Sequence, residues 1–177
     1  LNIISDYAHK LKKDLSELKI SVKFDDDDNK KPGWKFAEYE MKGVPLRIAV
    51  GPRDMENKTV ELARRDNLTK STELQEGLPK LLLETLDMIQ EELFSKASLF
   101  LNENTTQVES IDEMNRILNT KGGFVEAFWN GDYKSEQKIK DLTKATIRCI
   151  PLEDSKSGNC ILTGEPNSKK VIFARAY

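Results

Sequence analysis

Residues 33–54 contain side chains that can recognise a nucleobase. An aromatic ring, two carboxylates and two guanidinium groups stand at Phe36, Glu40, Arg47, Arg53 and Asp54. An aromatic ring can stack on a splayed base, which contributes about 1–3 kcal/mol. Carboxylates accept hydrogen bonds from the ring N–H and amino group of guanine, and arginine donates to its O6 and N7. The set therefore suits an unpaired guanine, with Lys35 and Lys42 near enough in sequence to contact phosphates.

No catalytic constellation accompanies these residues. A nucleophile needs a neighbouring base to activate it. The only histidine, His9, stands in a predicted helix without a partner motif, and we interpret it as a solvated or packed residue.

The polar stretch 25–31 begins with the Asp-x-Asp-x-Asn spacing of a calcium-binding loop. An EF-hand loop also requires Gly at its sixth position and Glu at its twelfth. Lys30 and Phe36 occupy those positions, so we expect no calcium site.

A predicted helix carries the first part of the candidate site. Pro32-Gly33 begins this helix and Gly43 ends it. At about 100° per residue, Trp34, Ala37 and Met41 share one face, which we predict to be the core face. Phe36 then lies roughly 130° from that face, and Glu40 about 40° further round. The outward position favours binding, although a solvated face with a lone aromatic residue is a common alternative.

A strand carries the second part. Val44, Leu46, Ile48 and Val50 alternate toward the predicted core, which leaves Arg47 on the opposite face. Arg47 there either packs its stem over apolar surface or presents its guanidinium to a partner. Gly51-Pro52 turns the chain, and Arg53 and Asp54 follow at the end of the strand, where loops commonly carry sites.

Hydrophobic periodicity predicts the remaining elements. Helices are expected at 1–19, 78–101, 111–118 and 135–142, and strands at 20–24, 58–64, 124–129, 146–150 and 171–174. The polar stretch 102–106 marks the predicted domain boundary. Helices and strands alternate on both sides of it, which indicates an α/β layer fold in both parts.

Composition indicates a soluble globular protein, with 38% hydrophobic and 33% charged residues among 177. No apolar run is long enough to span a membrane. The net charge of −2 argues against a globally basic nucleic-acid binder, but Lys30–Lys70 holds ten basic and six acidic residues, a local charge of +4. Such a region can attract phosphates. Two cysteines give no disulfide framework and favour a reduced, cytosolic setting.

Three segments of the chain resemble prolyl-tRNA synthetases of the archaeal/eukaryote-like type. The family's anticodon-binding domain is similar to PGWKFAEYEMKGVPLRIAVGPRD, and its additional C-terminal domain to TIRCIPLE and VIFARAY. The resemblance covers essentially the whole chain. It implies a mixed-sheet α/β/α anticodon-binding domain at 1–102, without its first strand, followed by a smaller α/β domain at 103–177. It also implies a missing upstream class II catalytic domain that uses ATP with magnesium, so the chain alone should not ligate proline to tRNA(Pro).

The resemblance also implies roles for individual residues. Family positions that match Phe36, Glu40, Arg47, Arg53, Asp54 and Lys70 are associated with the anticodon. Proline codons begin with CC, so the last two anticodon bases are guanines, and the set can supply two guanine sites. We expect Glu40 to read a base directly, and Lys35 and Lys42 to contact phosphate only.

The family's C-terminal domain often holds structural zinc through four cysteines. The matching positions here are Asn130, Ser135, Cys160 and Thr163. Tetrahedral zinc needs four nitrogen or sulfur ligands, so we predict that zinc is absent and that packing or hydrogen bonds join the two loops. Cys149 stands in an apolar strand, and we expect it to be buried.

The expected partner is tRNA(Pro), for a cytoplasmic enzyme that is a homodimer at full length and binds neither DNA nor membranes. In the family, the terminal tyrosine approaches the catalytic domain, so Tyr177 is a docking residue or a frayed end. Three alternatives stay open: the anticodon module of a class II synthetase for threonine, histidine or glycine, a non-catalytic α/β interaction protein, and, last, a free-standing enzyme.

Overall fold

The computed structural model describes residues 2–152 and 156–176. Its contacts divide the chain into two compact units, Leu1–Ser95 and Lys96–Tyr177. The division falls within the long helix α4 (Leu78–Glu103), and the predicted boundary at Asn102 lies further along the same helix. The predicted docking residue Tyr177 lies outside the described residues.

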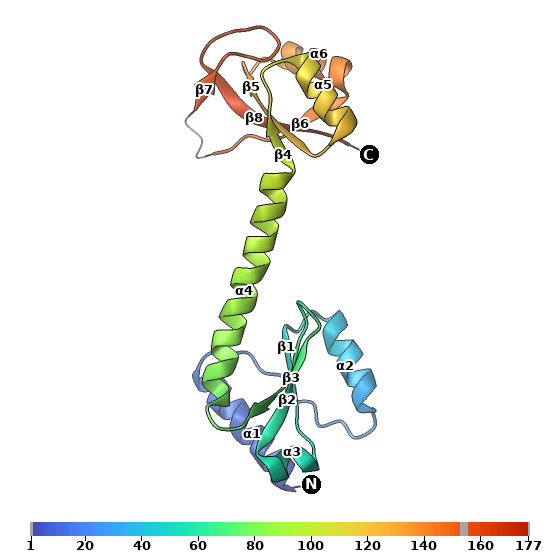
Figure 1. Ribbon diagram of the computed structural model, residues 1–177, viewed down its shortest axis with the longest axis vertical. Helices are drawn as coiled ribbons and strands as arrows, with labels where there is room; N and C mark the ends of the chain where they lie inside the picture. The colour runs from blue at the N-terminus through green and yellow to red at the C-terminus, as the bar shows by residue number, and fades with distance from the viewer. Residues whose placement is uncertain (1, 153–155, 177) are drawn as a thin grey trace. The chain divides into compact units, whose positions relative to one another are not determined.

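The first unit is built around an antiparallel sheet (Figure 1). Its elements are α1 (Asn2–Glu17), α2 (Pro32–Met41), β1 (Leu46–Ala49), α3 (Pro52–Asn57), β2 (Thr59–Arg64), β3 (Lys70–Leu74) and the start of α4 (Leu78–Glu103). The strand order is β1-β2-β3, with Ile48 opposite Leu62 and Glu61 opposite Thr72.

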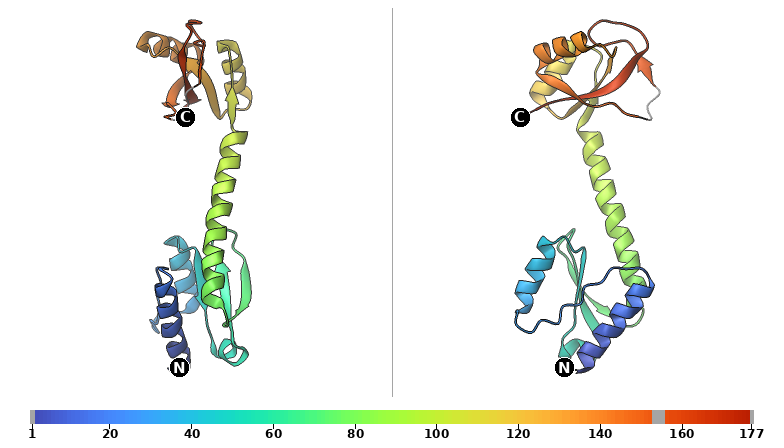
Figure 2. Two further views of the ribbon diagram at one scale, coloured as in Figure 1. Left: turned by 90° about the vertical axis from the view of Figure 1, so that its left-hand side faces the viewer. Right: turned by 180° about the vertical axis from the view of Figure 1, so that it is seen from behind.

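The two faces of this sheet differ in chemistry. Leu46, Ile48, Val60 and Leu62 point to one side and pack with residues of α1 and α4, namely Leu11, Leu15, Leu78 and Leu82. The other side carries Arg47 and Ala63, over which α2 lies. The strands thus separate α2 from α1 and α4 (Figure 2), which gives the expected three α/β/α layers.

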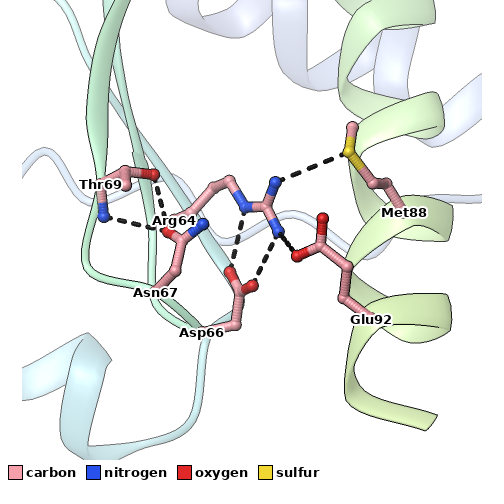
Figure 3. A network of polar contacts seen from close by, with 6 residues as sticks. All are labelled: Arg64, Asp66, Asn67, Thr69, Met88 and Glu92. Carbon is pink, nitrogen blue, oxygen red and sulfur yellow. Dashed lines mark hydrogen bonds and ion pairs between the residues drawn. The ribbon is translucent and has the colours of Figure 1, made fainter. Parts of the chain in front are cut away.

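A polar network joins the sheet to α4 on the apolar side (Figure 3). The guanidinium of Arg64 donates to both carboxylate oxygens of Asp66, at 3.1 and 2.7 Å. It also donates to Glu92 Oε2 at 2.6 Å and contacts Met88 Sδ at 3.7 Å. The pKa of Asp66 is lowered mainly by its hydrogen bonds from Arg64. The network fixes the β2–β3 turn against α4.

One predicted strand in this unit is wrong, and one strand was not predicted. The stretch 20–24 alternates as a strand should, and Ile20 and Val22 do pack against the core. It is nevertheless not a strand, because no described strand pairs with its backbone. Conversely, the polar stretch Lys70–Leu74 was not predicted, yet it forms β3 by pairing with β2.

The predicted core face of α2 is also wrong. Trp34 is 48% exposed and Met41 86% exposed, and Ala37 is exposed as well. Phe36 and Tyr39 are the half-buried aromatic residues, because they face the side of the sheet that carries Arg47. The row on β1 is confirmed at Leu46, Ile48 and Val50, whereas Val44 precedes the strand and is 37% exposed.

The second unit forms a mixed sheet covered by two helices. Its elements are the end of α4, β4 (Thr105–Gln107), α5 (Ile111–Thr120), β5 (Phe124–Trp129), α6 (Tyr133–Thr143), β6 (Ala145–Cys149), β7 (Ser157–Gly158) and β8 (Ser168–Arg175). The order is β4-β5-β8-β6, with β7 beside β8. The pair β4–β5 is parallel, and the other pairs are antiparallel.

The core of this unit follows the alternation of its strands. Val125 and Ala127 of β5 and Val171 and Phe173 of β8 point inward, where they meet side chains of α5 and α6, namely Met114, Leu118 and Ile139. The helices and strands predicted here are confirmed, with changes at their ends. β4 and β7 were not predicted, because strands this short carry too few alternating residues to be detected.

Among the described residues, no helix is long and apolar enough to cross a membrane.

Candidate nucleic-acid interface

Arg47 lies under the ring of Phe36. Its Cζ atom is 3.5 Å from the centroid of that ring, so the guanidinium lies against the aromatic face. The side chain of Arg47 is 12% exposed. The guanidinium of Arg47 itself is therefore packed, against Phe36, and its Nη1 donates to Glu61 Oε1 at 3.1 Å. Packing against an aromatic ring holds a guanidinium in one orientation.

A shallow hollow surrounds this pair. It is lined by residues of α2, β1 and β2 and the segments that follow α2 and β2, namely Phe36, Tyr39, Glu40, Val44, Arg47, Ala63, Arg64 and Arg65. The hollow brings together Phe36, Glu40 and Arg47 of the predicted set. Glu40 is exposed at the last turn of α2. Arg65 fixes that turn, because its Nε donates to the backbone oxygen of Glu40 at 2.8 Å.

Lys70 connects to the same group through Glu61. The Nζ atom of Lys70 is 3.8 Å from Glu61 Oε1, the oxygen that also accepts from Arg47. Lys70 is 58% exposed, and Glu61 is 40% exposed. The three charged side chains come from three neighbouring strands, which places Lys70 beside the hollow although it is distant in sequence.

Arg53 and Asp54 lie in α3, beyond the other end of β1. Asp54 has a structural task there, since its Oδ2 accepts from the backbone N–H of Gly51 at 2.7 Å. This bond satisfies a free donor before α3. Arg53 is exposed. Neither residue lines the hollow.

The two lysines predicted to contact phosphate each have a carboxylate partner. Lys35 Nζ is 2.9 Å from Asp25 Oδ1, and Lys42 Nζ is 2.7 Å from Glu38 Oε1. The hydroxyl of Tyr39 donates to Asp25 Oδ2 at 2.9 Å. The hydrogen bond from Lys35, with a further one from the Asp27 backbone, lowers the pKa of Asp25 to about 2. Lys35 and Tyr39 thereby hold the loop 25–31 against α2.

The positions discussed for zinc lie together in the second unit. Ser135 is buried, donates to Asn130 Oδ1 at 2.6 Å, and accepts from Trp129 Nε1 at 2.9 Å. Asn130 Nδ2 donates to Glu165 Oε2 at 2.8 Å, which joins the two loops. Burial raises the pKa of the Cys160 thiol, but hydrogen bonds from Thr163, Leu162 and Asn130 outweigh it and lower the pKa.

The prediction that Cys149 is buried is wrong, because Cys149 is exposed. The pairing of β6 with β8 shifts between Ile147 and Cys149. After this shift Cys149 pairs with Ile172, whose side chain points away from the core that Phe173 enters. His9 is exposed and packs edge-on against Phe24, with 4.9 Å between ring centroids, as its interpretation allowed.

Glu61 and Arg65 belong to this surface but were not in the predicted set. The strand predicted at 58–64 already contained the signal for Glu61. With Val60 and Leu62 buried, alternation directs Glu61 to the face that carries Arg47. Arg65 gave no such signal, because its contact with Glu40 depends on how α2 folds back on the sheet.

Two known families match most of the chain. Residues 2–85 match the family described as "Anticodon binding domain". Residues 111–177 match the family described as "Prolyl-tRNA synthetase, C-terminal". The first match contains the hollow and Lys70, and the second contains the loops around Ser135 and Cys160.

Curated relatives with about half of their residues identical are named "Proline--tRNA ligase". The protein of Christiangramia forsetii is 51% identical over 100% of the chain, which is 36% of that relative. The protein of Flavobacterium johnsoniae is 51% identical over 98% of the chain and 36% of the relative. That of Porphyromonas gingivalis is 49% identical over 98% of the chain and 35% of the relative. The chain therefore spans about a third of the length of these relatives.

Proposed function

Because the chain belongs to the prolyl-tRNA synthetase family, with its anticodon-binding domain in residues 2–85, we propose that this domain recognises the anticodon of tRNA(Pro). Its ligand is a single-stranded loop in which the last two bases of every isoacceptor are guanines. Bases in such loops are unstacked and can be read by hydrogen bonds on their edges.

The observation that carries the proposal is the grouping of Phe36, Glu40 and Arg47 around one hollow. A guanine there meets an exposed carboxylate that accepts from its N–H groups and a fixed guanidinium that donates to its O6 and N7. We further propose that Lys70, Arg53 and Asp54 contact the anticodon beyond this hollow. Lys35 and Lys42 are each paired with a carboxylate, so each must release that carboxylate before it can contact a phosphate.

The test is binding of the 177-residue chain to tRNA(Pro) transcripts in which either guanine is replaced by adenine. Each replacement is expected to weaken binding about tenfold or more, since a bidentate base contact contributes about 1–3 kcal/mol of discrimination. Equal affinity for all transcripts would contradict the proposal. Transcripts specific for threonine, histidine and glycine test the related synthetases in the same assay.

We propose that the longer protein is the ligase that joins proline to tRNA(Pro), acts in the cytoplasm as a homodimer, and does not bind DNA. ATP and magnesium then belong to a catalytic domain outside this chain. In that enzyme, Glu40→Ala is expected to lower kcat/KM for tRNA about tenfold and to leave proline activation by ATP unchanged. Glu76→Ala, at an exposed loop carboxylate, is the control. Equal loss in both steps would contradict the role of Glu40.

We propose that the second unit holds its loops without zinc. Amide and hydroxyl groups at Asn130, Ser135 and Thr163 are not the ligands of structural zinc. The hydrogen bonds of Ser135 and Asn130 support the proposal, because they join the loops that a metal would otherwise join. Elemental analysis that finds about one zinc per chain would contradict it.

A further inference from the structure

Glu61 stands between two cations of the proposed interface. In the sheet register Ala63 lies opposite both Arg47 and Lys70, so Glu61 is the diagonal neighbour of each. Diagonal neighbours in a sheet are within reach of long side chains. One oxygen, Glu61 Oε1, accepts from Arg47 Nη1 at 3.1 Å and lies 3.8 Å from Lys70 Nζ.

Glu61 does not use all the hydrogen-bonding capacity of the two cations. The Lys70 side chain is 58% exposed, so its ammonium group remains accessible, whereas Arg47 keeps an unsatisfied donor that is buried. Within the described part of the chain, the buried Nε of Arg47 has no hydrogen-bond partner. Phe36 restrains the guanidinium from one side and Glu61 from its Nη1, so it cannot turn freely. Glu61 itself is 40% exposed, which leaves its carboxylate accessible to a ligand.

A carboxylate between two cations changes which RNA group binds there. A phosphate offers acceptors only and carries negative charge, so an arginine and a lysine alone attract it without regard to sequence. Glu61 repels that charge and offers an acceptor beside the donors. The edges of guanine present both kinds of group, with acceptors at O6 and N7 and donors at N1 and N2.

We propose that Glu61 is a specificity-determining residue, which makes Arg47 and Lys70 select a guanine edge over a phosphate. This inference rests on the proposed function of the first unit. Glu61 places a negative charge among cations that attract RNA. Phosphate binding alone would not explain a carboxylate at this position.

The test compares Glu61→Gln with Glu73→Gln in the 177-residue chain. Gln keeps the shape of Glu and removes its charge. Glu73 is the matched control, because it lies on the neighbouring strand β3 opposite Val60 and hence on the other face of the sheet. The probes are the tRNA(Pro) transcript, the same transcript with each anticodon guanine replaced by adenine, and oligouridine as a sequence-independent strand.

Glu61→Gln is expected to bind oligouridine several-fold more tightly than the wild type. The slope of log affinity against log salt should steepen by about 0.7 for each cation that gains a phosphate. Discrimination between guanine and adenine should fall about tenfold, the loss of one good base contact. Glu61→Asp keeps the charge and should keep the shallow slope, while Glu73→Gln should resemble the wild type.

Three results would overturn the inference. If Glu61→Gln leaves both the discrimination between guanine and adenine and the salt dependence of affinity unchanged, the inference is refuted and the proposed function stays intact. Equal loss of affinity for every RNA at an unchanged slope would assign Glu61 a structural role only. Wild-type protein that binds all three kinds of RNA equally would overturn both this inference and the proposed function.

Discussion

Single side chains around Arg47 each restrain a neighbour and also face a ligand-accessible surface. Phe36 is an example, since its ring lies on the Arg47 guanidinium rather than standing free. Phe36 was predicted to be a ring available to stack on a base. In the structure the ring also orients the guanidinium of Arg47. Sequence alone could not reveal this, because the periodicity of α2 assigned Phe36 to the outer face.

Phe36→Ala should lower the free energy of unfolding of the first unit by about 1–2 kcal/mol, because a half-buried ring and its cation–π contact are lost. Trp34→Ala in the same helix is the control. Trp34 is 48% exposed, and we expect a loss below about 1 kcal/mol, although Lys30 lies over its ring. Urea unfolding measures both, and equal losses would contradict the packing of α2 described here.

Asp25 predicts how stability depends on pH. Its pKa is lowered from the ordinary 3.8 to about 2 by hydrogen bonds from Lys35 and the Asp27 backbone, so the ionised form is favoured in the folded state. The stabilisation is complete above pH 3.8 and is lost as the pH falls toward 2. The difference in unfolding free energy between the wild type and Asp25→Asn should shrink over that range. Asp26→Asn, at an exposed neighbour, should show a smaller change, and a difference independent of pH would refute the prediction.

At the scale of elements, long periodic segments were predictable and short or polar ones were not. The helix from Leu78 and the strand Phe124–Trp129 begin at the predicted residues, because many apolar positions specify each of them. β3 is a strand because its backbone pairs with that of β2. Residues 20–24 alternate like a strand but do not form one, because no described strand pairs with them. The side of α2 that packs depends on the sheet beneath it, which a helical pattern does not contain.

Ser135 tests how the loops of the second unit are held. Its hydroxyl is buried and bonds to Trp129, Asn130 and the backbone oxygen of Asp132. Ser135→Ala should lower the free energy of unfolding by about 2–3 kcal/mol, because buried polar partners are left unsatisfied. Thr120→Ala removes an exposed hydroxyl and should cost below about 0.5 kcal/mol. Thermal unfolding of both variants measures the difference, and similar shifts would contradict the network.

For the molecule as a whole, charge is unevenly distributed. The chain carries −2 in total but +4 between Lys30 and Lys70, where ten basic and six acidic residues stand. Several of these cations are already paired, as Lys35, Lys42 and Arg64 show. The number of phosphates they can neutralise is therefore smaller than their count.

The affinity for tRNA(Pro) should consequently depend only moderately on salt. A slope of log affinity against log salt of about −2 to −4 corresponds to a few phosphate contacts. Filter binding at several salt concentrations measures the slope. A slope near zero would contradict a phosphate contribution, and one near −10 would require a basic surface that this charge distribution does not provide.

The position of β3 at the edge of its sheet has a consequence for solubility. The free backbone groups of an edge strand can pair with another chain, which begins aggregation. β3 also exposes Leu74, 63% accessible, and so has the apolar surface that such pairing favours. Lys70 stands at the start of the same strand, and a charged lysine on an edge opposes the approach of a second strand. We therefore expect the residue proposed to contact RNA also to oppose the addition of neighbouring molecules to the sheet.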